Sequence, residues 1–242
     1  MRTCVWMMVA LLGSTVSHAA PPLPLENLAT ADDLVAEAQA LGKDIEECLA
    51  SRDSYEEFGS KLKHSTSLLM IVGQVLAEHP QPSKLKAAGA DLRDAAIVLN
   101  QTLSYDAAKA AQPAVRDALD GKSTGKAAVD VPWPQLMKYR PAMDQMNQRL
   151  PALRRVMRRP KDPVVESRQM LAMALLSIPM HADPRIKTPE EIPEWQAFTQ
   201  SMQTHLSDAT VKLKAKDLPA ANEAFVAGMA NCNKCHERFK PR

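Results

Sequence analysis

The sequence predicts an all-α protein organised as two tandem four-helix bundles. The chain of 242 residues contains only 8 glycines and 4% aromatic residues, and Ala, Leu, Met, Lys and Glu are common, which is typical of helical proteins. Strand-like alternation rich in Val, Ile and Tyr is not apparent. Apolar residues instead recur at steps of three and four, in segments separated by proline or glycine.

The first residues have the pattern of an export signal. Arg2 provides a positive end, residues 5–12 are apolar, and small residues precede a cleavage point after Ala19. We therefore expect residues 1–19 to be a cleaved signal peptide and the mature protein to be periplasmic. The apolar run is far shorter than the ~20 residues of a membrane span, and no later stretch qualifies, so no membrane insertion is expected.

Residues 20–121 are predicted to form the first bundle. After a proline-rich lead-in, Thr30 and Asp33 resemble a helix-capping pair, which predicts a first helix of about 31–50. Apolar spacing and proline breaks then predict further helices at about 54–78, 83–103 and 105–120. Four amphipathic helices joined by short loops favour a four-helix bundle.

Residues 122–130 are the predicted linker, because the chain reads Gly-Lys-Ser-Thr-Gly-Lys over residues 121–126. Residues 131–242 then form the second bundle. Its first helix is expected to carry an apolar stripe of Leu136, Tyr139, Met143, Met146, Leu150, Leu153 and Met157. Pro141 and Pro151 lie off this stripe and are expected to kink or divide the helix. Further helices are expected at about 164–181, 198–213 and 218–239.

The most specific motif is Cys232-Asn233-Lys234-Cys235-His236, a C-x-x-C-H attachment sequence for c-type haem. On a helix, the two cysteines and His236 share a face. Two thiols can then add to the two vinyl groups of one porphyrin, and the imidazole can bind its iron. A zinc site needs a fourth ligand, and a redox dithiol needs a βαβ context; neither is evident. One covalent haem c is therefore predicted.

The two predicted bundles resemble each other as repeats. Residues 92–95 with Leu99 parallel residues 206–209 with Leu213. In this register Leu119 stands where Cys232 stands, and no C-x-x-C-H follows it. The first bundle is therefore expected to carry no haem.

Residues 131–242 resemble the cytochrome c prime family, which includes low-spin relatives, in the position of the motif near the end of the last helix. Phe239 matches the family's aromatic residue after the motif, and Lys240 stands where arginine is usual. Residues 139–143 resemble the Tyr-Arg-Gln-like stretch that precedes the distal residue, although proline replaces glutamine. The resemblance implies a haem-binding bundle in which Phe239 and Lys240 belong to the haem environment.

Bundle geometry indicates what faces the distal side of the iron. In an up-down-up-down bundle the last helix lies antiparallel to the first, so its C-terminal motif faces the N-terminal half of that helix. Met143 best matches the distal position and is the candidate sixth ligand, with Met146 next; an apolar distal pocket is the alternative.

Electron transfer in the periplasm is the function that these patterns favour. Binding of a diatomic gas, nitric oxide or carbon monoxide, is one alternative, and a haem module that docks in a larger redox complex is another. No Ser/His/Asp triad or paired carboxylates are evident, so we do not expect an enzyme. His64, His79, His181 and His205 have no metal-ligand spacing on one helix, which favours surface or capping roles.

The charge is divided between the halves. Residues 20–120 contain 9 Lys+Arg against 16 Asp+Glu, a net charge of −7, and residues 121–242 contain 20 against 12, a net charge of +8. The basic half, with its run of arginines at 154–159, could attract an acidic redox partner protein or dock on the acidic half of its own chain. The alternative is two solvated surfaces. Nucleic acid is not an expected partner, because aromatic and basic residues are not interleaved.

Cys48 is the odd cysteine once Cys4 leaves with the signal peptide and the motif takes two. It shares a helical stripe with Leu34, Leu41 and Ile45, which predicts a buried apolar side chain. An intermolecular disulfide, and with it a homodimer, is the alternative.

Overall fold

The computed structural model of the protein describes residues 24–183 and 188–239. These residues form eleven helices and no strand, which confirms the predicted all-α class. None of the described helices is both long and apolar enough to cross a membrane. The predicted signal peptide of residues 1–19 and Lys240 of the predicted haem environment lie outside the described residues.

The first half of the chain contains six helices: α1 (Leu25–Leu28), α2 (Ala31–Cys48), α3 (Arg52–Glu57), α4 (Gly59–Glu78), α5 (Gly89–Gln101) and α6 (Tyr105–Leu119). The capping pair forms as predicted, since the Thr30 side chain accepts a hydrogen bond from the Asp33 backbone N–H at 3.1 Å. The predicted second helix is divided at Phe58 into α3 and α4. The third begins at Gly89 and not near residue 83, because residues 84–88 form turns.

The second half contains five helices: α7 (Trp133–Leu136), α8 (Tyr139–Arg158), α9 (Pro163–His181), α10 (Ile192–Lys214) and α11 (Leu218–Phe239). Of the two effects expected of Pro141 and Pro151, a kink or a division of the helix, the division does not occur. The break falls at Met137, whose backbone is extended with φ −151° and ψ 135°. Pro141 lies in the first turn of α8, where its missing N–H has no intrahelical acceptor, and α8 continues through Pro151.

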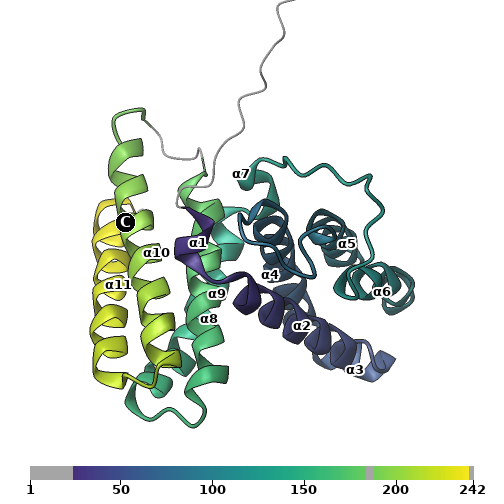
Figure 1. Ribbon diagram of the computed structural model, residues 1–242, viewed down its shortest axis with the longest axis horizontal. Helices are drawn as coiled ribbons and strands as arrows, with labels where there is room; N and C mark the ends of the chain where they lie inside the picture. Colours follow the sequence, from purple (N-terminus) through teal and green to yellow (C-terminus); the bar gives the residue numbers. More distant parts are fainter. Residues whose placement is uncertain (1–23, 184–187, 240–242) are drawn as a thin grey trace, which may run out of the picture.

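The helices pack in two groups that follow the chain (Figure 1). In one group α2 packs on α4 and α6, and α5 lies between α4 and α6. In the other group α8, α9, α10 and α11 pack in chain order, and α11 packs along α10 but touches α8 only locally. The two groups meet where α4 contacts α9, and the short α1 reaches across to α9 and α10.

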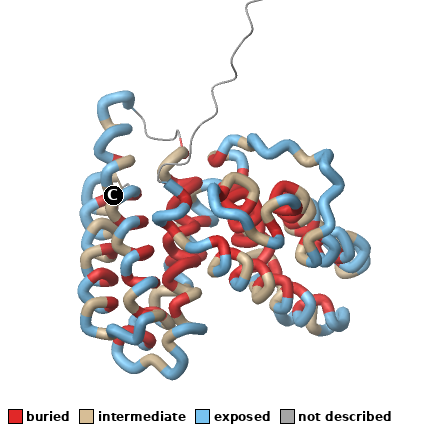
Figure 2. The backbone as a smooth tube through the Cα atoms, in the orientation of Figure 1, coloured by how far each residue is buried: buried red, intermediate tan, exposed pale blue. Residues whose placement is uncertain are grey.

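The two helices at this junction are buried on every side over long stretches (Figure 2). All of residues 68–76 of α4 and all of residues 170–180 of α9 are buried. A helix that is apolar all round must be covered all round, and α9 is covered by α8, α10 and α4. The buried apolar side chains accordingly form one continuous cluster that includes both halves of the chain.

Glycine brings α4 and α5 into backbone contact. A Cβ atom added at Gly73 would lie 2.6 Å from the backbone N of Arg93 and 2.8 Å from the carbonyl oxygen of Gly89. A Cβ atom at Gly89 would in turn lie 2.6 Å from the backbone N of Ala77. Only residues without a Cβ permit this crossing, because backbone atoms cannot move aside as side chains do.

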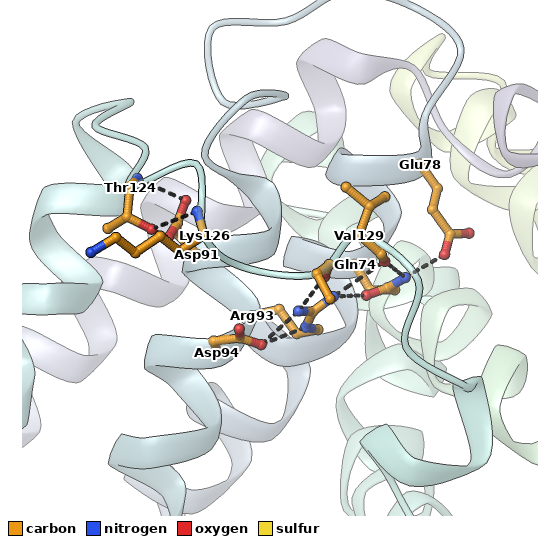
Figure 3. A network of polar contacts seen from close by, with 9 residues as sticks. Gln74, Glu78, Asp91, Arg93, Asp94, Thr124, Lys126 and Val129 are labelled. Atoms are coloured by element: carbon orange, nitrogen blue, oxygen red, sulfur yellow. Dashed lines mark hydrogen bonds and ion pairs between the residues drawn. The ribbon is translucent and has the colours of Figure 1, made fainter.

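The predicted linker of residues 122–130 is exposed but is held against α5 (Figure 3). Arg93 is fully buried and donates from Nη2 to the carbonyl oxygen of Ala128 at 2.7 Å. Asp91 accepts a hydrogen bond from Ser123 Oγ at 2.8 Å and another from the backbone N–H of Thr124 at 3.1 Å. The segment is therefore tied to the first group of helices near both of its ends.

Cys48 lies in the core with no exposed surface, as its place on the apolar stripe predicts. Burial raises the pKa of its thiol above the ordinary value. A thiol in this position cannot reach another chain while the protein is folded, so the structure gives no support to the alternative of an intermolecular disulfide.

Candidate haem-attachment site

The three reactive side chains of the motif lie on one face of the last turns of α11. Cys235 is buried, Cys232 and His236 are half-buried, and all three line one narrow pocket. The intervening Asn233 and Lys234 are exposed. This arrangement follows from the helix repeat, because positions three and four apart share a face while those between them point away.

Thr199 and Asn231 also line this pocket, and the rest of its lining consists of apolar side chains from three other helices. They are Met143 of α8, Met180 of α9, and Phe198 and Met202 of α10. The Cys232 thiol points at Met202, with 3.2 Å between the two sulfur atoms. Of the two methionines proposed as distal ligand, Met143 lines the pocket, whereas Met146 is buried elsewhere and does not line it.

An aromatic cluster adjoins the pocket through Phe198, which lines it. The ring of Phe239 packs edge-on against Trp195 at 5.6 Å and against Phe198 at 6.3 Å between ring centres. Tyr139 at the start of α8 lies 5.5 Å from Trp195, and the Trp195 indole N–H donates to the carbonyl oxygen of Met180 at 2.8 Å. The end of α11 and the N-terminal half of α8 therefore lie close together.

Charged residues fasten the end of α11 to α10 beside the motif. Arg238 pairs with Glu191 at 3.2 Å and with Glu194 at 3.1 Å. Its guanidinium also lies 5.0 Å from the centre of the Phe239 ring. Exposed ion pairs contribute little individually, but two carboxylates three positions apart together restrain this arginine and the turn that carries it.

Burial keeps both thiols of the motif protonated. It raises the pKa of Cys232 to about 11. It also raises the pKa of Cys235 to about 11, with smaller contributions from Cys232 and Glu194. At neutral pH both groups are neutral thiols in an apolar setting, and neither is a reactive thiolate.

The residues around the pocket fit a covalently held haem in chemistry and in position. Two thiols and an imidazole share one helix face, and thioether and aromatic side chains face them. The pocket itself is small, about 10 Å³, because the side chains of Met143, Met180 and Met202 fill the space between the helices. These side chains are unbranched and flexible, and α11 contacts α8 only locally.

The other histidines that the structure describes are not exposed: His79 is buried, and His64, His181 and His205 are half-buried. His79 is buried at the end of α4 with Nε2 3.1 Å from the carbonyl oxygen of Ala29, and His181 Nδ1 lies 3.0 Å from Thr199 Oγ1. His64 lines a cleft between the two halves. Within residues 24–183 and 188–239, no group of three or more His, Cys, Asp or Glu side chains is arranged to hold a metal ion.

Sequence reasoning missed four of the residues that build this site: Met180, Trp195, Phe198 and Met202. A signal for two of them was present. The chain has only 3 Trp and 4 Phe, and Trp195 and Phe198 lie three positions apart at the start of α10, on one helix face. The methionines gave no such signal, because methionine at helical spacing is common in any apolar core.

No protein-family model matches the chain, and no curated protein or solved structure is significantly similar to it.

Proposed function

We propose that the protein is an exported c-type cytochrome that transfers electrons in the periplasm. One observation carries the proposal: Cys232, Cys235 and His236 line a single apolar pocket, and the thioether of Met143 lines the same pocket from another helix. A C-x-x-C-H sequence that arose by chance could lie equally well on an exposed part of a helix. Its position at an apolar pocket between helices therefore supports a binding role.

Each residue of the site has a distinct role in this proposal. Cys232 and Cys235 would hold the porphyrin through thioether bonds, and His236 would be the proximal iron ligand. Met143 would be the sixth ligand, and Phe239 and Lys240 would belong to the haem surroundings. When bound, the haem would supply the one-electron chemistry of its iron.

The wider organisation of the proposed cytochrome is two tandem four-helix bundles, of which only the second, residues 131–242, binds haem. The chain-order packing of α8 to α11 supports this interpretation of the second half. The proposed cytochrome c prime-like character of that half depends on the motif at the end of the last helix. In the first half α6 ends at Leu119 without a comparable motif.

Haem staining of a denaturing gel tests the attachment. The protein, produced in a host competent for haem attachment, is expected to give a peroxidase-positive band at about one haem per chain. A variant with both Cys232→Ala and Cys235→Ala should lose the band, whereas the Cys48→Ala variant, which changes a cysteine far from the motif in sequence, should keep it. A wild-type band that never stains would overturn the proposal.

Absorbance spectra with and without carbon monoxide then separate electron transfer from gas binding. A low-spin spectrum that carbon monoxide leaves unchanged is expected of a carrier with two strong axial ligands. A five-coordinate spectrum with ready carbon monoxide binding would contradict electron transfer and would favour gas binding as the function.

A further inference from the structure

A second cavity, independent of the haem motif, lies between the two halves of the chain. It is a cleft of about 590 Å³, within the usual size of small-molecule sites. The first half contributes Glu37, Lys61 and His64 to its lining, and the second half contributes Gln145 and Arg149. Sites at such junctions are common because two separately folded surfaces leave a concave space between them.

Two polar groups in this cleft are buried without partners. The side-chain oxygen of Gln145 is buried with no hydrogen bond, and only 3% of the residue is exposed. The Nε of Arg149 is also buried and unpaired, although Nη1 of the same side chain donates to Gln169 at 2.7 Å. A buried polar group without a hydrogen bond lowers the stability of the folded protein. These two groups therefore indicate a ligand that forms hydrogen bonds with them.

The charges in the cleft leave a positive surplus. Glu37 is paired with Arg168 at 2.6 Å, and Lys61 is paired with Asp44 at 2.9 Å. The remaining carboxylate, Glu166, accepts backbone hydrogen bonds at the start of α9, including one from the Lys161 N–H at 2.8 Å. These acidic groups are therefore occupied by other partners.

Two arginines of α8 supply the surplus. Arg149 and Arg155 both line the cleft and form no ion pair with any part of the chain that the structure describes. Burial lowers the pKa of Arg149, and the nearby carboxylates of Glu37 and Asp44 oppose this shift only in part. A carboxylate can accept two parallel hydrogen bonds from such a group.

We propose that this cleft binds a small polyhydroxylated carboxylate of the sugar-acid type. Its carboxylate would pair with Arg149 and Arg155, and a hydroxyl would donate to the free oxygen of Gln145. Neutral polar side chains, Ser60 and Gln148 among them, line part of the remaining wall and suit further hydroxyls. The rest of that wall is apolar and consists of Leu41, Ala152, Val156 and Val165. A highly charged anion is disfavoured, because the three acidic residues lie in the same cleft.

Three six-carbon probes test the ligand class against the purified protein, whether or not it carries haem. Gluconate carries the carboxylate and the hydroxyls, hexanoate carries only the carboxylate, and sorbitol carries only hydroxyls. Because a ligand that binds only the folded protein stabilises it, 10 mM gluconate should raise the melting temperature by about 3 °C at constant ionic strength. Hexanoate and sorbitol should give a clearly smaller rise.

Variants on α8 assign the effect to the cleft. Arg149→Gln and Arg155→Gln should each weaken gluconate binding, measured by calorimetry, roughly tenfold or more, because each loses a charge-assisted hydrogen bond. Arg154→Gln is the matched control: it removes the same charge from an exposed position of the same helix that does not line the cleft, and should bind as the wild type does.

Circular dichroism shows whether each variant is folded. Arg155 is exposed, so Arg155→Gln is expected to fold and still tests the cleft if Arg149→Gln does not fold. The proposal is overturned if gluconate gives no stabilisation, if the three probes stabilise equally, or if the folded cleft variants bind as tightly as Arg154→Gln. Failure of haem attachment would not affect this readout, so the two proposals fail separately.

Discussion

Arg168 on α9 donates a hydrogen bond from Nε to the carboxylate of Glu37 on α2 at 2.6 Å, across 131 positions of the chain. The Glu37 side chain is only 4% exposed, whereas that of Arg168 is 31% exposed. A second ion pair, between Lys214 and Asp33, also joins the two halves. Ion pairs between specific residues therefore join the acidic half of the chain to the basic half.

The Glu37 pair predicts an unusual pH dependence of stability. Burial raises the pKa of Glu37, and Arg168 opposes this shift only in part. Between the ordinary and the raised pKa the folded protein binds more protons at this site than the unfolded chain does. The contribution of Glu37 to the free energy of unfolding is therefore complete below its ordinary pKa and is lost as the pH rises through the raised one.

Urea denaturation of the wild type and of Glu37→Gln between pH 4 and pH 8 measures this effect. Because glutamine cannot ionise, the stability of the wild type relative to the variant should decrease as the pH rises. Glu46→Gln, which removes a half-exposed carboxylate paired with Arg116, is the control and should show no such trend. A difference between wild type and Glu37→Gln that is constant with pH would contradict the assignment.

Met143 and Met146 of α8 allow a matched test of the proposed sixth ligand. Met143 lines the pocket with Cys232, Cys235 and His236, and Met146 does not. Met143→Ala should change a low-spin absorbance spectrum to high-spin and allow carbon monoxide to bind, because one axial ligand is lost. Met146→Ala should keep the spectrum but cost about 2–5 kcal/mol of stability, as core truncations do. The reverse pattern would make Met146 the ligand.

Gly73 is predicted to be among the least replaceable residues of the chain. Alanine is the better helix former by about 1 kcal/mol, yet its Cβ would lie 2.6 Å from the backbone N of Arg93. We expect Gly73→Ala to destabilise the protein by about 3 kcal/mol in chemical denaturation. Gly59→Ala is the control, since no atom lies within 4 Å of the added Cβ, and its effect should stay within about 1 kcal/mol. Equal effects would contradict the close crossing of α4 and α5.

Arg93 is predicted to restrain the segment between the two halves. Its fully buried guanidinium pairs with Asp94 at 2.7 Å and holds the carbonyl oxygen of Ala128. In Arg93→Met, trypsin should cut faster after Lys126, and stability should fall by about 3 kcal/mol, because the buried polar contacts are lost. Arg116→Met, which removes an exposed arginine from α6, should leave the cleavage rate unchanged. An unchanged rate in Arg93→Met would show that the segment is held by other contacts.

The sequence predicted most of the helices, because the signals for them are local. Thr30 and Asp33 marked the start of α2, and proline marked the end of α4. One error fell where a boundary coincides with a contact between distant residues. The third helix begins at Gly89, one of the two glycines at the crossing with α4, which apolar spacing alone could not indicate.

The sequence by itself also determined which side chains of the C-x-x-C-H motif share a helix face. Cys232, Cys235 and His236 share a face because the helix repeat fixes the directions of residues three and four apart. Cys48 was likewise predicted to be buried from its own helical stripe, and it is. Each of these inferences needs only one helix.

Only the tertiary structure decided what lies opposite those faces. It distinguished Met143 from Met146, brought Trp195 beside Phe239, and formed the cleft that contains Gln145 and Arg149. It also placed α4 and α9 at the centre of the molecule. The physical reason is that helix periodicity tells which face of a helix is apolar, but the partner of that face is selected by packing between segments far apart in the chain.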